Sequence, residues 1–542
     1  MQQRNQIWHS LEKLYLVIEK RIDWVWITVL FLAATFIFTI NLGELPLRDW
    51  DEGTVAQVAR EIFRAPFGSH TWLYPTLGGE PYYNKPPLMH ILISWIYRFA
   101  GINEWTSRVP GAFLTALSVP LLYAIAREIY ARRSEALYSA LIYLTMLPVV
   151  RHGRLAMLDG AVLCFFMVMV VCLLRSRRDL RYCLGVGIGF GLICLTKGML
   201  AILLGTVAFA FLLWDTPRLL TSKWMWFAMF LGSLPILLWY YLQITRYGNS
   251  FIDEGLLRQS FNRISESVEN HRQPLWYYPL EIIKYTSPWL IFIPSGLRYT
   301  WENRNSSWAR FVLSWFSVYL IAISLMSTKL PWYIFPIYPS IALACGARLA
   351  QVENLPLLTS YPRHWTIGLA FLAVGGVGGA LFYIFGNEVQ ISLAFILAAF
   401  ALSAILTINL LRIGDRKFFW VLLWGTYVSL VLLMKSNYWN WELNEAYPVK
   451  PVAAMIQTFV PNSQIIYTSS KNHRPSLDFY SDRKIIPKSL QQIQSLWEKE
   501  IRPYFLLEEP DFKQLNLKSL EVLGSSSSSN LKLILVTKNT NN

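Results

Sequence analysis

Repeated apolar runs of about 20 residues constrain the fold of this chain more than any other feature of its sequence. An α-helix needs about 20 mostly apolar residues to cross the hydrocarbon core of a bilayer. The run Trp24–Leu42 is the first of many that reach this length. The chain is 54% hydrophobic and 15% charged, whereas soluble domains carry roughly 25% charged residues. The sequence therefore predicts a polytopic α-helical membrane protein.

The net charge of +15 does not indicate a nucleic-acid partner. The basic residues fall in short loops between the apolar runs, as in the pair Arg132–Arg133, and this is the distribution that places such loops in the cytoplasm. Residues 1–22 are polar, amphipathic and basic, and we expect them to stay cytoplasmic without being cleaved as a signal peptide. The five cysteines lie in apolar runs without metal-ligand spacing, which indicates buried small apolar residues.

The orientation of the basic clusters predicts a long outer loop early in the chain. If they are cytoplasmic, the run Arg108–Tyr130 crosses from outside to inside, and the run Leu88–Ala100, at about 13 residues, is too short to span. Residues 43–107 then form an outer loop, in which Asp51–Arg64 and Leu88–Ala100 are expected as helices along the membrane surface. A second outer loop is expected over residues 246–280. About thirteen spans follow, near residues 24–42, 108–130, 134–150, 157–175, 181–197, 199–214, 223–243, 281–298, 308–326, 331–350, 364–386, 389–411 and 416–434.

The composition changes after residue 435. Residues 436–542 alternate short apolar runs with helical patterns, which predicts a small α/β domain after a transmembrane domain of residues 1–435. An odd number of spans would place this domain outside. We expect the serine-rich segment Ser525–Ser529 to form a turn. The expected strands and helices of the domain are Gln464–Tyr467, Tyr504–Leu507 and Leu531–Val536, and Val452–Val460 and Ser489–Glu500.

Polar and ionisable residues collect near the span ends on the predicted outer face. Basic residues there break the orientation rule, and ionisable groups at membrane depth are costly enough to indicate a function. An anionic lipid head group would explain them, because lysine and arginine neutralise a phosphate. The chain has no glycine-rich phosphate loop, so a glycosyl donor would be lipid-linked. These residues are Asp51, Glu52, Glu80, Lys85, Arg151, His152, Arg154, Asp159, Lys197, Arg263, His271, Arg272, Lys329 and Tyr333.

Each of these residues also has a purely structural interpretation. The cluster Arg151–Arg154 could extend towards lipid phosphates. Lys197 could interact with the C-terminus of a helix, and Asp159 with the N-terminus of the next one. His271 could be a structural histidine, and Lys329 could mark a helix break. The functional interpretation depends on all of them converging on one face.

Six short segments, in order, resemble a known family. They read RDWDEGTVAQVAREI, GGEPYYNKPPL, RHGRLAMLDGAVL, LTKGMLAILL, NHRQPLWYYPLEII and STKLPWYIFPIYPSIAL, and they cover most of residues 45–345. The sequence resembles the membrane-embedded glycosyltransferases that use polyprenyl-phosphate sugars, notably the lipid A aminoarabinose transferases and the protein O-mannosyltransferases. The resemblance implies a GT-C-type fold with about thirteen transmembrane helices and an outer C-terminal domain.

The resemblance also implies roles for individual residues. The acidic pair of the first loop falls on Asp51 and Glu52, with the catalytic aspartate at Asp51, and the second acidic position falls on Asp159. The donor-phosphate positions fall on Lys85, Arg263, Lys329 and Tyr333. We expect acceptor or loop support from Glu80, Tyr82 and His271.

One position departs from the family pattern. The aminoarabinose transferases often carry Glu immediately before the Lys-Pro-Pro motif, where this chain has Asn84. This departure weakens the case for a metal site that would use the Glu, and it leaves the sugar open. We expect no cofactor and no metal, because lysine and arginine can stabilise the leaving phosphate.

The resulting hypothesis is an inverting glycosyltransferase of the plasma (inner) membrane. It would move a sugar from a polyprenyl-phosphate donor to a hydroxyl or phosphate of a lipid, glycan or protein acceptor on the outer face. The alternative from another class is a transporter or flippase of polyprenyl-linked lipids. A transporter would favour charges at the bilayer midplane and paired broken helices in two repeats, whereas here the polar residues collect at one surface and no internal repeat is found. A scaffold that binds partners would explain neither acidic loop.

Overall fold

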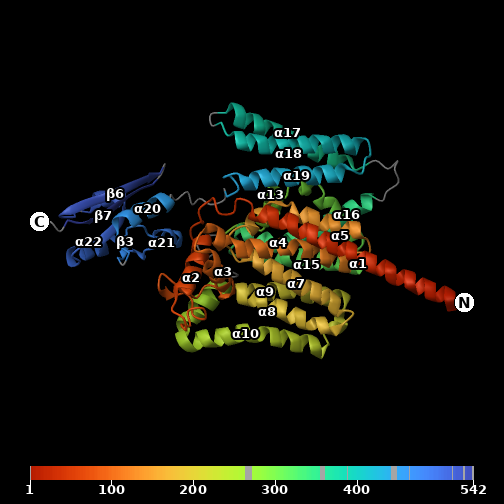
Figure 1. Cartoon of the computed structure of the whole chain (residues 1–542), viewed down its shortest axis with the longest axis horizontal. Helices are drawn as coiled ribbons and strands as arrows, with labels where there is room; N and C mark the ends of the chain where they lie inside the picture. Colours follow the sequence, from red (N-terminus) through yellow and green to blue (C-terminus); the bar gives the residue numbers. More distant parts are fainter. Residues whose placement is uncertain are drawn as a thin grey trace. The chain divides into compact units, whose positions relative to one another are not determined.

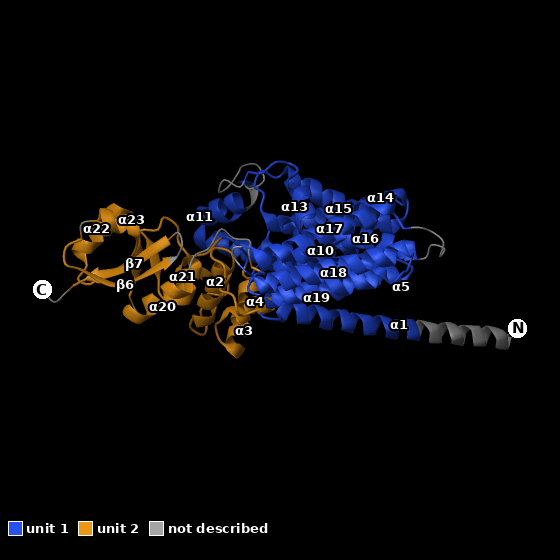
Figure 2. Ribbon diagram, turned by 90° about the horizontal axis from the view of Figure 1, so that it is seen from above, with its two compact units in different colours: residues 1–41, 84–86, 111–439 blue, residues 42–83, 87–110, 440–542 orange. Residues whose placement is uncertain are grey.

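A computed structural model of the chain describes residues 2–262, 272–353, 361–386, 389–440, 449–462, 464–515, 517–528 and 531–539. Its contacts divide the chain into two compact units (Figure 2). Unit 1 contains residues 1–41, 84–86 and 111–439, and unit 2 contains residues 42–83, 87–110 and 440–542. The candidates Arg263 and His271 lie outside the described residues.

Unit 1 is built from helices, and ten helices in the described part of the chain are long and apolar enough to cross a membrane. Three of these ten belong to α1 (Gln2–Thr39), α8 (Cys183–Lys197) and α19 (Phe418–Lys435). The polytopic helical prediction is therefore confirmed. The other helices of the bundle are α4 (Glu104–Ile129), of which unit 1 holds the part from residue 111, α5 (Arg133–Leu144), α6 (Leu147–Gly153), α7 (Asp159–Ser176), α9 (Leu200–Asp215), α10 (Lys223–Tyr247), α11 (Asn249–Phe251), α13 (Tyr277–Tyr285), α14 (Ile293–Glu302), α15 (Ser307–Leu325), α16 (Tyr338–Glu353), α17 (Arg363–Phe385) and α18 (Ile391–Arg412).

The remaining three of the thirteen expected spans are helical but short or broken. The expected span 134–150 is split into α5 and α6, and 281–298 into α13, a short turn and α14. Pro148 and Pro288 lie at these breaks, and proline cannot donate the backbone hydrogen bond that a continuous helix needs. The third, α9, has 16 residues. The second expected outer loop also contains a helical stretch, the π-helix η3 (Ile252–Phe261).

Glycines on α8 bring this helix into close contact with its neighbours. A Cβ atom at Gly187 would lie 1.9 Å from the Ala228 carbonyl oxygen of α10, and one at Gly189 would lie 2.7 Å from Met169 Cβ of α7. Small residues of this kind let transmembrane helices approach each other closely. Because α7 and α8 are consecutive and packed together, the C-terminal end of α8 lies beside the N-terminal end of α7 (Figure 1).

The first polar loop forms two helices and a hairpin within unit 2. The helices are α2 (Glu52–Arg64) and α3 (Leu88–Ala100), as the sequence predicted. The hairpin pairs β1 (Thr76–Leu77) with β2 (Glu80–Pro81). Its two turn residues are glycines with φ of +62° and +81°, the conformation that tight hairpin turns require.

The C-terminal part of unit 2 is a five-stranded sheet with helices on both faces. The strand order is β4-β3-β5-β7-β6, with the first three strands parallel and the last two antiparallel. Buried residues of α20 and α21 pack on one face, and those of α22 pack on the other. The α/β prediction is confirmed. The elements are α20 (Val449–Phe459), β3 (Ile466–Thr468), α21 (Pro475–Ser481), β4 (Ile485–Pro487), α22 (Leu490–Lys499), β5 (Tyr504–Glu508), α23 (Glu509–Gln514), β6 (Leu520–Ser528) and β7 (Leu531–Lys538).

The turn expected at Ser525–Ser529 is wrong for residues 525–528, and Ser529 lies outside the described residues. Residues up to Ser528 belong to β6 and pair in antiparallel register with β7, with Ser525 opposite Ile534. A run of serines does not by itself favour a strand, but pairing with a neighbouring strand decides the conformation of an edge strand.

Candidate functional site

The facing ends of α7 and α8 form a buried charged group in unit 1. Lys197 Nζ lies 2.6 Å from Asp159 Oδ1, and His152 Nε2 of α6 lies 3.8 Å from Asp159 Oδ2. The Asp159 side chain is only 5% exposed. A buried carboxylate keeps its charge when a cation and hydrogen bonds compensate it. The ion pair with Asp159 in turn fixes the position of the Lys197 ammonium.

Aromatic rings from the segment after α15 surround the same group. The ammonium of Lys197 lies 5.7 Å from the centre of the Tyr333 ring, and the His152 ring stacks on Trp332 at 6.2 Å. Tyr333 and Trp332 belong to the short helix η6 (Pro331–Ile337). An ammonium against an aromatic face is stabilised by a cation–π interaction. Tyr333, which the resemblance assigns to the donor phosphate, is thus part of this group.

The Lys-Pro-Pro segment lies at the same end of unit 1. Gly198, which follows Lys197, has a φ of +56°, and a Cβ atom there would lie 4.0 Å from Pro86 Cγ. Lys85 precedes Pro86 in the chain, and both belong to unit 1. The structure therefore brings the segment that carries Lys85 to the turn that carries Lys197, over a separation of more than a hundred residues.

Lys329 lies just before η6 and is 5% exposed. Its ammonium donates a hydrogen bond of 2.5 Å to the Met326 carbonyl oxygen. Burial, and then the positive charge of Arg272, lower the pKa of Lys329, because both disfavour its charged form. Arg272 is drawn close by a backbone bridge to Thr328. An anion bound here would relieve the mutual repulsion of the two side chains.

Arg151 and Arg154 bind helix ends rather than extending towards lipid. Arg154 is fully buried and donates to the carbonyl oxygens of Ile37 and Ile40 at 2.7 and 2.5 Å, and its guanidinium lies 4.5 Å from the Trp439 ring. Arg151 donates to the Trp439 carbonyl oxygen. Cations at a helix C-terminus satisfy its unpaired carbonyl groups. These arginines tie together the ends of α1 and α19.

In unit 2, Glu52 forms a fully buried ion pair. Arg108 binds both of its carboxylate oxygens at 2.8 Å, and both side chains are 0% exposed. Arg108 also donates to three carbonyl oxygens of the chain before the acidic loop, those of Leu42, Leu45 and Pro46. This paired, planar geometry is the strongest that arginine makes. Glu52 is therefore placed to fix the start of α2.

Asp51 occupies the N-cap position of α2 and makes no capping hydrogen bond with its side chain. It is half-buried, while Tyr82 near it is 7% exposed. Burial, with a smaller effect from the charge of Asp51, raises the pKa of Tyr82. The Tyr82 ring contacts His90 edge-on at 5.6 Å. Glu80, in contrast, is 80% exposed on the hairpin and lies 3.7 Å from Lys484.

Residues at the start of α21 hold the residues just before Asp51. Asp49 is bound by Arg474 at 2.7 Å and by the Ser476 hydroxyl at 2.6 Å. Trp50 donates its indole N–H to the His473 carbonyl oxygen at 2.8 Å and stacks under Arg474 at 5.1 Å. We call these five residues, all in unit 2, the Asp49 clamp. The acidic loop is thus positioned by side chains more than 420 residues away.

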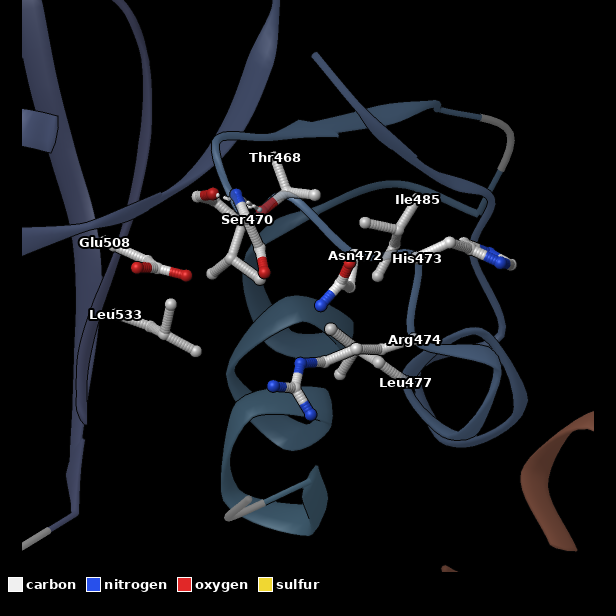
Figure 3. A pocket seen from close by; sticks show the side chains of 10 residues that line it. Thr468, Ser470, Asn472, His473, Arg474, Leu477, Ile485, Glu508 and Leu533 are labelled. Atoms are coloured by element: carbon white, nitrogen blue, oxygen red, sulfur yellow. Dashed lines mark hydrogen bonds between the residues drawn. The ribbon is translucent and has the colours of Figure 1, made fainter. Parts of the chain in front are cut away.

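The clamp residues His473 and Arg474 also border a small crevice (Figure 3). It lies at the C-terminal ends of the neighbouring strands β3 and β5. The chain leaves β3 for α21 and reaches β5 from α22. Parallel sheets bind ligands at such a reversal of strand order. The crevice encloses about 10 Å³, which is roughly the room that one water molecule needs.

Replacing Arg474 with Ala should lower the free energy of unfolding by about 2 kcal/mol. Asp49 would remain buried after losing its charged partner, and an unsatisfied buried group retains its desolvation cost. Chemical denaturation of the purified full chain measures the change. Arg502→Ala is the matched control, because Arg502 is exposed and a surface substitution typically changes stability by less than about 0.5 kcal/mol. Equal effects of the two variants would contradict a clamp.

Sequence reasoning missed Arg108, Arg474 and Ser476. Arg108 carried a usable signal, because it is a lone arginine at the start of a span next to the acidic loop. No signal in the sequence relates Arg474 and Ser476 to Asp49, since the chain between them has no pattern that specifies their contact.

The profile of the family described as dolichyl-phosphate-mannose-protein mannosyltransferase matches residues 84–241. An undecaprenyl phosphate-alpha-4-amino-4-deoxy-L-arabinose arabinosyl transferase of Pseudomonas fluorescens is 28% identical over 335 residues, which are 60% of this chain and 59% of that protein. One of Yersinia enterocolitica is 26% identical over 63% of this chain and 62% of that protein. The chain thus spans about three fifths of the length of the curated relatives it matches. The resemblance expected from the sequence is confirmed.

Solved structures show the same fold. The crystal structure of ArnT from Cupriavidus metallidurans bound to undecaprenyl phosphate superposes with a TM-score of 0.78 at 19% identity, covering 95% of this chain and 98% of that one. An oligosaccharyltransferase of Archaeoglobus fulgidus superposes with a TM-score of 0.54 at 12% identity, covering 86% and 64%. The chain therefore has the GT-C-type fold of polytopic membrane proteins.

Proposed function

Because this chain has a GT-C-type fold and resembles sugar transferases named for undecaprenyl phosphate, we propose that it is an inverting glycosyltransferase. It moves a sugar from a polyprenyl-phosphate donor to a hydroxyl or phosphate of a lipid, glycan or protein acceptor. We further propose that it acts in the plasma (inner) membrane, with its site and its C-terminal domain, residues 436–542, on the outer face.

The observation that carries the proposal is the buried charged group in unit 1. Lys197, its partner Asp159, the Tyr333 ring and the segment of Lys85 come from separate parts of the chain to one end of the helices. An ammonium has three N–H donors, so Lys197 can bind Asp159 and still donate to a phosphate oxygen. Fixed cations in a poorly hydrated site stabilise a leaving phosphate without reorganising.

Asp51 is our candidate for the general base. In the proposed step, the acceptor oxygen attacks the anomeric carbon and its proton moves to Asp51. The bond from that carbon to the phosphate oxygen breaks, and its electron pair leaves with the polyprenyl phosphate. A single displacement of this kind inverts the anomeric centre. Asp51 is chosen because the resemblance places the catalytic aspartate there, and its half-buried side chain lies at the start of α2.

The geometry favours positioning roles for the two other acidic candidates. Glu52 is bound at both oxygens by Arg108, and Asp159 faces Lys197 and His152. We therefore propose that Glu52 orients Asp51 and that Asp159 orients Lys197. The roles of the remaining candidates stay predictions. For the donor phosphate these are Arg263, Lys329 and Tyr333. For support of the acceptor or the loop they are Glu80, Tyr82 and His271.

A transfer assay tests the proposed function. The purified protein is incubated with a panel of radiolabelled polyprenyl-phosphate sugars and with membrane extract. Pentose and hexose donors should both be included, with a 4-amino-4-deoxy-arabinose donor first because the relatives are named for that sugar. We expect label to move to one extractable acceptor. Movement of intact donor across a vesicle membrane, without labelled product, would instead support a transporter of polyprenyl-linked lipids.

Replacing Lys85 with Ala should raise the KM for the donor roughly 10- to 100-fold. A hydrogen bond to a charged group contributes about 1.5–3 kcal/mol, and each 1.4 kcal/mol is a factor of ten. Titration of the donor in the transfer assay measures the change. The control is Lys223→Ala. Lys223 begins α10 and lies about 25 Å by helix geometry from Tyr240 of the same helix, whose hydroxyl would lie 2.8 Å from a Cβ atom at Gly198. An unchanged KM in the Lys85 variant would remove this residue from the donor site.

A further inference from the structure

A second hollow lies in unit 1, where α4, α5, α14, α15 and α16 end. Figure 2 shows α5, α14 and α16 at the end of unit 1 where α1 extends outward. The hollow has a volume of about 530 Å³, which is within the range of ligand pockets. Its lining includes Tyr130, Arg132, Glu135, Tyr299 and Trp308.

Two opposite charges lie in this pocket without pairing to each other through their side chains. Glu135 is half-buried, and its carboxylate accepts a hydrogen bond of 3.2 Å from the backbone N–H of Arg132. The Arg132 side chain is exposed. Among the described residues, neither side chain forms an ion pair. The neighbouring Arg133 differs, because it binds Glu19 at 2.6 Å and Asp23 at 2.9 Å.

Aromatic rings form one wall of the pocket. The Trp308 ring lies 5.4 Å from Tyr130 and 5.7 Å from Tyr299. The Tyr130 hydroxyl is used in a hydrogen bond to the Leu343 carbonyl oxygen, so Tyr130 offers the pocket its ring. Tryptophan and tyrosine prefer the depth of lipid head groups, and their faces attract an ammonium group.

We propose that this pocket binds the head group of a zwitterionic aminophospholipid. The ammonium lies against Glu135 and the aromatic wall, and the phosphate lies against the exposed guanidinium of Arg132. The pairing follows from chemistry: a half-buried carboxylate that forms no ion pair among the described residues attracts an ammonium, and an exposed arginine binds a phosphate with two parallel hydrogen bonds. Because the pocket lies among helix ends of a membrane protein, the occupant is a lipid. The site is separate from the buried charged group of Asp159 and Lys197 and does not depend on the proposed transfer reaction.

Native mass spectrometry of the delipidated full-length protein tests the proposal. Phosphatidylethanolamine and phosphatidylglycerol with the same acyl chains share the phosphate, and only the first carries an ammonium. We expect phosphatidylethanolamine to bind about tenfold more tightly. Glu135→Gln should abolish this preference, and Arg132→Gln should weaken both lipids equally. Equal binding of the two lipids to the unmodified protein, or an unchanged preference in Glu135→Gln, would overturn the proposal.

Matched controls come from an exposed pair on α14. Arg298 and Glu302 pair at 2.8 Å and are 81% and 54% exposed, and neither lines the pocket. Arg298→Gln and Glu302→Gln change the same charges and should leave lipid binding unchanged. Thermal unfolding of each variant verifies that it is folded. Soluble glycerophosphoethanolamine should bind far more weakly than the lipid, and equal affinity would overturn the assignment to a membrane lipid.

Discussion

Asp51→Asn should lower the rate of sugar transfer about 10²–10⁴-fold while the protein stays folded. General-base catalysis contributes this range, and asparagine keeps the shape of the side chain but cannot accept the acceptor's proton. The loss should appear in kcat, with little change in the KM for the donor, because the residues proposed for the donor phosphate are unaltered. Single-turnover transfer from a labelled donor measures the rate of the chemical step directly.

Two comparisons make this expectation specific. Asp179→Asn, at a short helix far along the chain, should retain full activity and serves as the matched control. Unfolding of Asp51→Asn should stay close to that of the unmodified protein, because asparagine has nearly the same shape and volume as aspartate. Near-normal transfer by Asp51→Asn would show that another group takes the proton.

Glu52→Gln should lower the free energy of unfolding more than any of the other proposed variants, whereas Asp51→Asn should mainly lower the rate of transfer. Breaking a buried ion pair by removing one charge costs about 3–5 kcal/mol, because the remaining charge stays buried without compensation. Arg108 would still be held among the carbonyl oxygens of Leu42, Leu45 and Pro46, but its charge would face a neutral amide. Chemical denaturation of the purified protein measures the loss. Activity should fall as well, since Asp51 precedes the altered residue.

A double-mutant cycle isolates the pair. The loss in Glu52→Gln combined with Arg108→Gln should be smaller than the sum of the two single losses, because each single variant already removes the same interaction. Replacing the exposed Glu302 by Gln should cost less than about 1 kcal/mol. If Glu52→Gln costs no more than this surface variant, the buried pair does not stabilise the acidic loop.

The elements of the fold were largely predictable, because local patterns specify them. The helices expected at Asp51–Arg64 and Leu88–Ala100 are α2 and α3 almost to the residue. Apolar runs of sufficient length indicated the spans, and ten are present as long helices in the described part of the chain. The failures occur where non-local packing acts, as at the serine-rich strand β6, which pairs with β7.

The candidate site was predictable only by residue type. Charges near span ends and the family motifs indicated Lys85, Asp159 and Tyr333, but a purely structural role was also open for Asp159. The structure adds the contacts: Asp159 binds Lys197, and Arg154 binds the end of α1. Neither contact follows from spacing, because the partners lie on different helices.

The sequence by itself determined that this chain is a bundle of membrane helices with a small α/β domain, because the length of an apolar run and the alternation of short patterns are local properties. Only the tertiary structure decided which charges meet. Helices α7 and α8 approach closely through glycines and bring Asp159 to Lys197, and the C-terminal sheet brings Arg474 to Asp49. Buried charges must find partners, and the partner available to each depends on the packing of segments that are distant in the chain.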